Sequence, residues 1–134
     1  NTAINGDFTA GATGWTANAP WAIGAGVASI DGSQVANTTL EQAAGLVAGQ
    51  LYTVTFTLSG VSAGGLTVQA GNTATPTAAY TANGTYTTVL RANGNGNLIF
   101  TADPAFAGTI DNISIQAGAV ATPITYQAGE TLQN

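Results

Sequence analysis

The sequence contains no histidine, cysteine, methionine or lysine, and its only basic residue is Arg91. Without histidine or cysteine there is no His-based acid–base catalyst, Ser-His-Asp triad, thiol nucleophile, zinc site or thiolate-ligated iron–sulfur site. Charged residues make up 5 % of the 134 residues, against roughly 25 % in ordinary domains. These absences exclude most catalytic classes and leave binding and structural roles.

The few charges are mostly negative, with six acidic residues and a formal net charge of −5. Proteins that bind nucleic acid line the phosphate backbone with Lys and Arg, so no nucleic acid is expected as a partner. No apolar run approaches the roughly 18 residues of a membrane-spanning helix, and no membrane partner is expected either. The hydrophobic content of 45 % argues against disorder. The length fits one domain that folds without disulfides.

Alternating apolar and polar residues predict an all-β chain. In residues 50–59, Tyr52, Val54, Phe56 and Leu58 alternate with threonines, which is the period of a half-buried strand. Further strands are expected at residues 21–23, 27–30, 38–43, 66–69, 85–92, 97–102 and 109–116. Asn-Gly and Asp-Gly turn signals separate them at near-regular spacing. The pattern predicts a sandwich or barrel of about 8–10 strands.

Three motifs resemble those of jelly-roll β-sandwich modules of the carbohydrate-binding type. They are Asn5-Gly6-Asp7-Phe8 followed by Gly14-Trp15, then residues 46–56, which fit L-x-x-G-x-x-Y-x-V-x-F, and finally the closing strand at 108–115. They stand in the family's order and cover residues 4–116. The resemblance implies an antiparallel jelly-roll β-sandwich over residues 1–116, with a C-terminal extension at 117–134. Similar modules occur in bacteriophage virion proteins and surface proteins, so the motifs are more specific for the fold than for sugar binding.

Two aromatic residues are candidates for stacking on a sugar ring. Trp21 follows Pro20 in a segment rich in glycine and alanine, and Tyr80 has no apolar partner larger than alanine two residues away. Both are therefore candidate exposed carbohydrate-binding residues, although packing within the domain is an equal alternative for Trp21. The resemblance implies that Trp15, in contrast, is a structural plug.

The resemblance also implies a structural calcium ion that joins the first and last strands. Calcium takes six to eight oxygen ligands, and the candidate ligands in this chain are Asn5, Asp7 and Asp111. The alternative is that these side chains accept hydrogen bonds from turn and backbone N–H groups. Apart from this calcium, no cofactor is expected.

The chain is not expected to be an enzyme. Paired carboxylates can hydrolyse glycosides, but the only two glutamates, Glu41 and Glu130, lie in a predicted strand and in the C-terminal segment. Neither is flanked by residues that an acid–base site needs. Arg91 is expected to form an ion pair with Glu41 or with an aspartate.

Residues 117–134 continue beyond the predicted closing strand. They contain the apolar residues Val120, Ile124, Tyr126 and Leu132, with a period of two at Ile124 and Tyr126. A flexible tail is usually more polar. We therefore hypothesise an assembly arm that adds a strand to the sheet edge of a neighbouring subunit. The alternative is a last strand packed on its own domain.

These features predict a non-enzymatic structural protein of an assembly, either a bacteriophage capsid decoration (cement) protein or a tail-associated protein. Its nearly uncharged surface suits close packing between subunits, so the expected partners are copies of itself, typically as a trimer, and a capsid or other assembly protein. A carbohydrate-binding module with a glycan partner is the first alternative. An extracellular filament or surface-layer subunit is the second. The expected location is the virion surface or the extracellular space.

Overall fold

A computed structural model describes residues 3–118, which form nine strands and no helix. In chain order the strands are β1 (Trp15–Ala17), β2 (Ala22–Gly24), β3 (Val27–Asp31), β4 (Thr38–Ala43), β5 (Leu51–Ala63), β6 (Leu66–Ala70), β7 (Gly84–Arg91), β8 (Asn97–Ala102) and β9 (Ala107–Ala117). In this described range, no helix is long and apolar enough to cross a membrane. The all-β prediction is confirmed.

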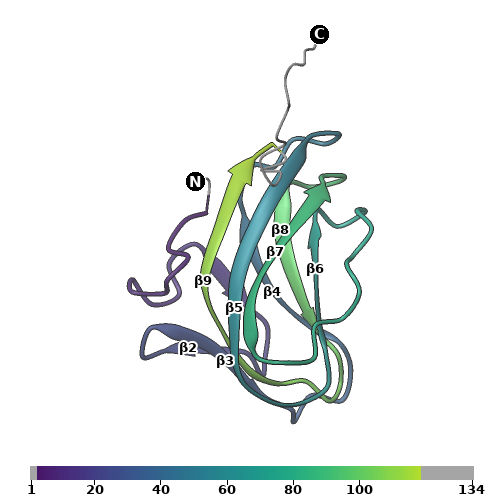
Figure 1. Ribbon diagram of the computed structural model, residues 1–134. Coiled ribbons are helices and arrows are strands. Elements are labelled where there is room, and N and C mark those ends of the chain that lie inside the picture. Colours follow the sequence, from purple (N-terminus) through teal and green to yellow (C-terminus); the bar gives the residue numbers. More distant parts are fainter. Residues whose placement is uncertain (1–2, 119–134) are drawn as a thin grey trace, which may run out of the picture.

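The strands form two antiparallel sheets that pack face to face (Figure 1). One sheet has the order β1-β4-β8-β6, and the other has the order β2-β3-β9-β5-β7. Figure 1 shows β9, β5 and β7 in front of β4, β8 and β6. The predicted sandwich is therefore the observed architecture.

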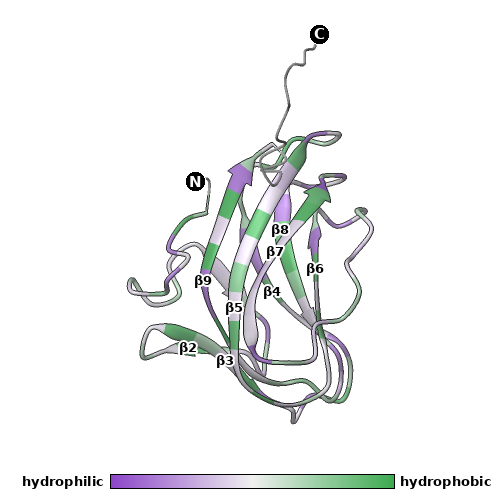
Figure 2. Ribbon diagram, viewed as in Figure 1, coloured by the Kyte–Doolittle hydropathy of each residue, from purple (hydrophilic) through white to green (hydrophobic). Residues whose placement is uncertain are grey.

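The core lies between the sheets and follows from the alternation along the strands. In β5, the side chains of Tyr52, Val54, Phe56 and Leu58 are buried between the sheets, and Figure 2 shows the corresponding alternation of hydropathy along the strand. Phe56 meets Phe100 of the opposite sheet edge to face, with ring centroids 5.4 Å apart. Burying each such side chain stabilises the fold by about 1.5–3 kcal/mol, so this alternation is the main cause of the architecture.

Strands β6 and β7 are edge strands of the two sheets, and among the described residues only the edge of β6 is covered by another segment. The edge of β6 is lined by the segment 77–80, where Tyr80 exchanges backbone hydrogen bonds with Leu66 (2.8 and 3.0 Å). The N–H of Thr77 also donates to the carbonyl of Val68 (3.0 Å). Strand β7 ends its sheet, and within residues 3–118 no strand pairs with its outer edge. The connection from β6 to β7 thus closes one edge and leaves the other open.

Strand β9 ends beside the start of β5. The N–H of Gly118 donates to the carbonyl of Leu51 (2.8 Å), and Oγ1 of Thr53 donates to the carbonyl of Gly118 (2.9 Å). The residues of the hypothesised arm lie outside the described residues: Val120, Ile124, Tyr126 and Leu132. The arm therefore stays a prediction.

Candidate functional site

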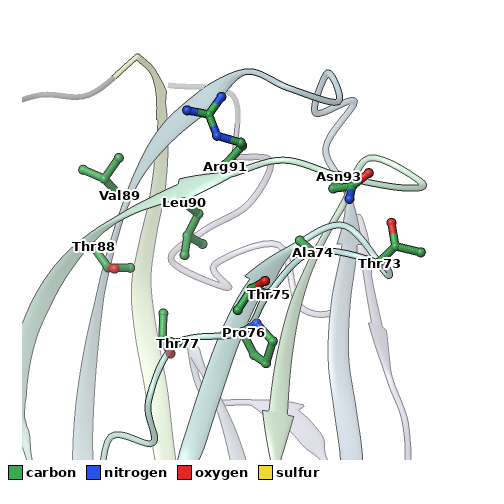
Figure 3. A pocket seen from close by; sticks show the side chains of 10 residues that line it. All are labelled: Thr73, Ala74, Thr75, Pro76, Thr77, Thr88, Val89, Leu90, Arg91 and Asn93. Atoms are coloured by element: carbon green, nitrogen blue, oxygen red, sulfur yellow. The ribbon is translucent and has the colours of Figure 1, made fainter.

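A cleft of about 320 Å³ lies between the open edge of β7 and the segment 73–77 (Figure 3). Hydroxyl groups reach it from both walls: Thr88 stands on the strand, and Thr73, Thr75 and Thr77 stand on the facing segment. Apolar surface comes from Pro76, Val89, Leu90 and Ala74. The cleft therefore combines hydrogen-bonding groups with apolar contact area, the combination that small-molecule sites generally present.

The segment wall is fixed at its ends by hydrogen bonds. The side-chain amide of Gln69 donates from Nε2 to the carbonyls of Gly71 (2.9 Å) and Ala74 (3.3 Å). At the other end, Oγ1 of Thr77 accepts a bond from the N–H of Val68 (3.2 Å). These contacts tie the wall to β6, so the shape of the cleft is formed before a ligand enters.

In the wall formed by β7, buried and exposed side chains alternate along the strand. Leu90 is buried and forms part of the floor, whereas Val89 has an exposed fraction of 45 %. Figure 3 shows Val89 and Arg91 projecting from one side of the strand and Leu90 from the other. The exposed rim of the cleft thus has an apolar side chain next to a cationic one.

Arg91 does not form the ion pair that was expected from the sequence. Its Nη1 donates to the carbonyl oxygen of Gly49 (2.7 Å), and no carboxylate in the range 3–118 pairs with it. Glu41 instead lies on the outer face of the other sheet and accepts hydrogen bonds from Thr39 (2.8 Å) and Asn97 (3.3 Å). The expectation is wrong because the two residues belong to different sheets.

The expectation that Trp21 is an exposed stacking residue is also wrong. Its side chain is only 4 % exposed, and its ring packs on Phe106 with centroids 6.3 Å apart. Nε1 lies 3.4 Å from the carbonyl of Thr38, to which it donates. Trp21 is therefore a core residue, which rules out ring stacking with a sugar on the surface.

Tyr80 is half-buried and lies outside the cleft. Its ring packs edge to face on Phe56 (5.1 Å between centroids) and against Tyr86 (4.6 Å). A sugar-binding role for Tyr80 stays a prediction. Trp15, in contrast, is buried and packs on Phe8 (5.2 Å), which confirms its interpretation as a structural plug.

The residues proposed for calcium are engaged in local hydrogen bonds. All the polar atoms of the Asn5 side chain bond to the backbone of residues 10–13. One oxygen of Asp7 accepts two bonds from Thr9, and one oxygen of Asp111 accepts a bond from the N–H of Asn112. In the described part of the chain, no three acidic residues gather as a metal cluster. A bound calcium therefore stays a prediction.

A second hollow, of about 450 Å³, lies on the outer face of the five-stranded sheet. Its polar groups include Ser29, Asp31, Ser62 and Thr109. Oδ1 of Asp31 accepts a bond from the N–H of Ser33 (3.0 Å). This hollow carries the negative charge of Asp31, whereas the cleft beside β7 carries the positive charge of Arg91.

Comparisons with known proteins concern the fold. No protein-family model and no curated protein matches the chain. A solved structure described as "CBM4 structure and function" is similar, with a TM-score of 0.55 and 16 % sequence identity. The match covers 85 % of this chain and 98 % of that one. At this identity the likeness shows a β-sandwich like that of a carbohydrate-binding module, and it shows no link to a virion.

Proposed function

We propose that the chain is a carbohydrate-binding module that holds a sugar in the cleft between β7 and the segment 73–77. The observation that carries the proposal is the placement of threonine hydroxyls on two facing walls around exposed apolar surface. A sugar presents hydroxyls at its ring edges and C–H groups on its faces. Thr75 and Thr88 can bond to the hydroxyls, while Pro76 and Val89 contact the C–H face.

The size and surroundings of the cleft support this assignment. A volume of about 320 Å³ is at the lower end of the roughly 300–1,000 Å³ of small-molecule sites, which suits one or two sugar units. Among residues 3–118, no aromatic side chain lines the cleft, so hydrogen bonds carry more of the affinity than ring stacking does. The lack of histidine and cysteine agrees with binding without chemistry. The similarity to a CBM4 structure supports the same class of function.

The test is binding of a polysaccharide panel by affinity electrophoresis, followed by calorimetry on any polymer that retards the protein. The double variant Thr75→Ala/Val89→Ser removes a hydroxyl and an apolar contact from the cleft, and we expect its affinity to fall at least about tenfold. The matched control is Thr16→Ala/Val35→Ser, which makes the same changes at exposed positions outside the cleft. Equal loss in both variants, or no retention on any polysaccharide, would show that the cleft is not a sugar site.

A second candidate function is that of an assembly subunit, as predicted from the sequence. It is favoured by the open edge of β7, whose eight residues carry one charge, that of Arg91. Proteins usually protect such edges with charges, prolines or bulges. A subunit of a virion, a filament or a surface layer would cover this edge with a neighbouring chain. Light scattering over a range of concentrations tests this, and a protein that stays monomeric at all of them would remove the candidate.

A further inference from the structure

We infer that the cleft beside β7 selects acidic sugars, whose carboxylate binds the guanidinium of Arg91. This inference rests on the proposed carbohydrate-binding function and names the class of sugar. It starts from the position of the chain's only cation, which lines the rim of a cleft that is otherwise uncharged. Within residues 3–118, no carboxylate forms an ion pair with this arginine.

The guanidinium has free hydrogen-bonding capacity. It is exposed, and its one bond in the described part of the chain goes from Nη1 to the carbonyl of Gly49. That bond holds the side chain over the start of β5, while the guanidinium retains further N–H donors in its planar fork. Such a fork matches the two oxygens of a carboxylate, and this charge-assisted pairing is stronger than a bond between neutral groups.

Two acidic residues of the same sheet, Asp111 and Asp31, are far from this cation. On the same sheet, Arg91 pairs with Leu51 of β5, whereas Asp111 pairs with Thr57, six positions further along that strand. At about 3.4 Å per residue, this separates the two charges by about 20 Å, which is well beyond the screening length of about 8 Å at physiological salt. Asp31 pairs with Ala107, which itself lies beside Ala63 at the far end of β5. Neither aspartate therefore neutralises the guanidinium at the rim of the cleft.

The arrangement of neighbouring groups fits a sugar acid better than a simple anion. Val89 lies two residues before Arg91 and projects from the same side of β7, whereas Thr88 stands on the other side with Leu90. A pyranose that rests on Val89 at the rim of the cleft can direct a carboxylate on its ring toward Arg91. A simple anion would use the guanidinium alone and gain nothing from the apolar contact with Val89.

The experiment compares polymers that differ only in their carboxylates. Polygalacturonate and alginate are each measured beside the same polymer after chemical reduction of its carboxylates to hydroxymethyl groups. We expect at least one uronate polymer to bind about tenfold or more tightly than its reduced form, and this preference to weaken as salt rises. In R91Q the two forms should bind equally, whereas R91K, which keeps the charge, should retain part of the preference. The unfolding midpoints of both variants should match that of the parent protein, because the side chain is exposed.

Two results would overturn the inference in different ways. If the reduced polymers, or other neutral glycans, bind as well as the uronates, or if R91Q keeps the preference, the selection of acidic sugars is wrong and the carbohydrate-binding function stands. If no glycan of either kind is retained, the carbohydrate-binding function itself fails and the inference fails with it.

Discussion

Nε1 of Trp15 donates a hydrogen bond to the carbonyl oxygen of Asn5 (3.0 Å), and this contact fastens the N-terminal loop to the sandwich. Asn5 in turn organises the loop, because its Oδ1 accepts a bond from Ala10 and its Nδ2 donates to Gly11 and Thr13. Its φ of +53° lies in the left-handed region, which asparagine tolerates better than most residues. The spaced motif that begins with Asn5 and ends at Trp15 is therefore one folded unit.

Replacing Asn5 by alanine should consequently destabilise the domain. The variant loses three side-chain hydrogen bonds and must hold an alanine at positive φ, so we expect the free energy of unfolding to fall by about 2 kcal/mol. Chemical denaturation followed by tryptophan fluorescence measures the change. Asn37→Ala, at an exposed position, is the control and should have an effect within about 0.5 kcal/mol. Similar losses in the two variants would contradict the role given to Asn5.

The fold could be predicted because its cause is local. Alternation in β5 depends only on neighbours along the chain, and Tyr52, Val54, Phe56 and Leu58 are buried as the sequence predicted, although Thr53 is buried as well. The motif around Trp15 was also recognisable, since its two ends lie ten residues apart. Such features need no knowledge of which strands meet.

The site could not be predicted because its parts meet only in the tertiary structure. Trp21 stands among small and polar residues in the sequence, and its apolar partner Phe106 comes from the other end of the chain. The cleft lies between the segment 73–77 and β7. In the sequence, both segments have the composition of an ordinary threonine-rich surface. As the only basic residue, Arg91 was a weak indication of a binding site. Whether a carboxylate lies close enough to pair with it depends on the strand register, which the sequence does not show.

Two neighbouring glycines offer a test of close packing at the end of β5. Both have positive φ, +60° at Gly60 and +69° at Gly64. A Cβ on Gly60 would meet nothing within 4 Å, whereas one on Gly64 would lie 2.2 Å from the backbone nitrogen of Phe106. We expect Gly60→Ala to cost about 1 kcal/mol through backbone strain, and Gly64→Ala to cost about 2 kcal/mol more through overpacking. Thermal or chemical unfolding of both variants measures the difference, and equal costs would refute the close approach.

On the outer face of the five-stranded sheet, threonines of β5 and β7 pair across the two strands. Thr55 and Thr87 lie opposite each other with their Oγ1 atoms 3.1 Å apart, and Thr57 and Thr85 repeat the pair at 3.0 Å. Replacing Thr55 and Thr87 by valine, singly and together, should reveal a coupling energy of about 0.2–1 kcal/mol in a double-mutant cycle. The control cycle uses Thr55 and Thr85, which are not opposite each other and should be nearly additive. Coupling of the same size in both cycles would mean that the hydroxyl pairs contribute nothing specific.

In two exposed turns, hydrogen bonds lower the pKa values of aspartates and so link the stability of the fold to acid pH. The backbone N–H and then the hydroxyl of Thr9 bond to Asp7 and hold its pKa below the ordinary value of 3.8. The side chain and then the backbone of Ser33 lower the pKa of Asp31 in the same way. Because each pKa is lower in the folded state than in the unfolded chain, both groups stabilise the fold above about pH 4. This contribution disappears as the pH falls through the lowered values.

We therefore expect the free energy of unfolding to be level from about pH 5 to pH 8, since there is no histidine to titrate in that range, and to decline below about pH 4. Urea denaturation at pH 7, 5, 4 and 3 measures the profile. The variant Asp7→Asn/Asp31→Asn keeps a side-chain oxygen that can accept the turn hydrogen bonds, but it has no carboxylate to protonate at either position. Its decline below pH 4 should accordingly be smaller than that of the parent protein. If the two profiles fall in parallel, the acid sensitivity must arise from the other carboxylates, and the hydrogen bonds of Thr9 and Ser33 do not favour the charged forms in the folded state.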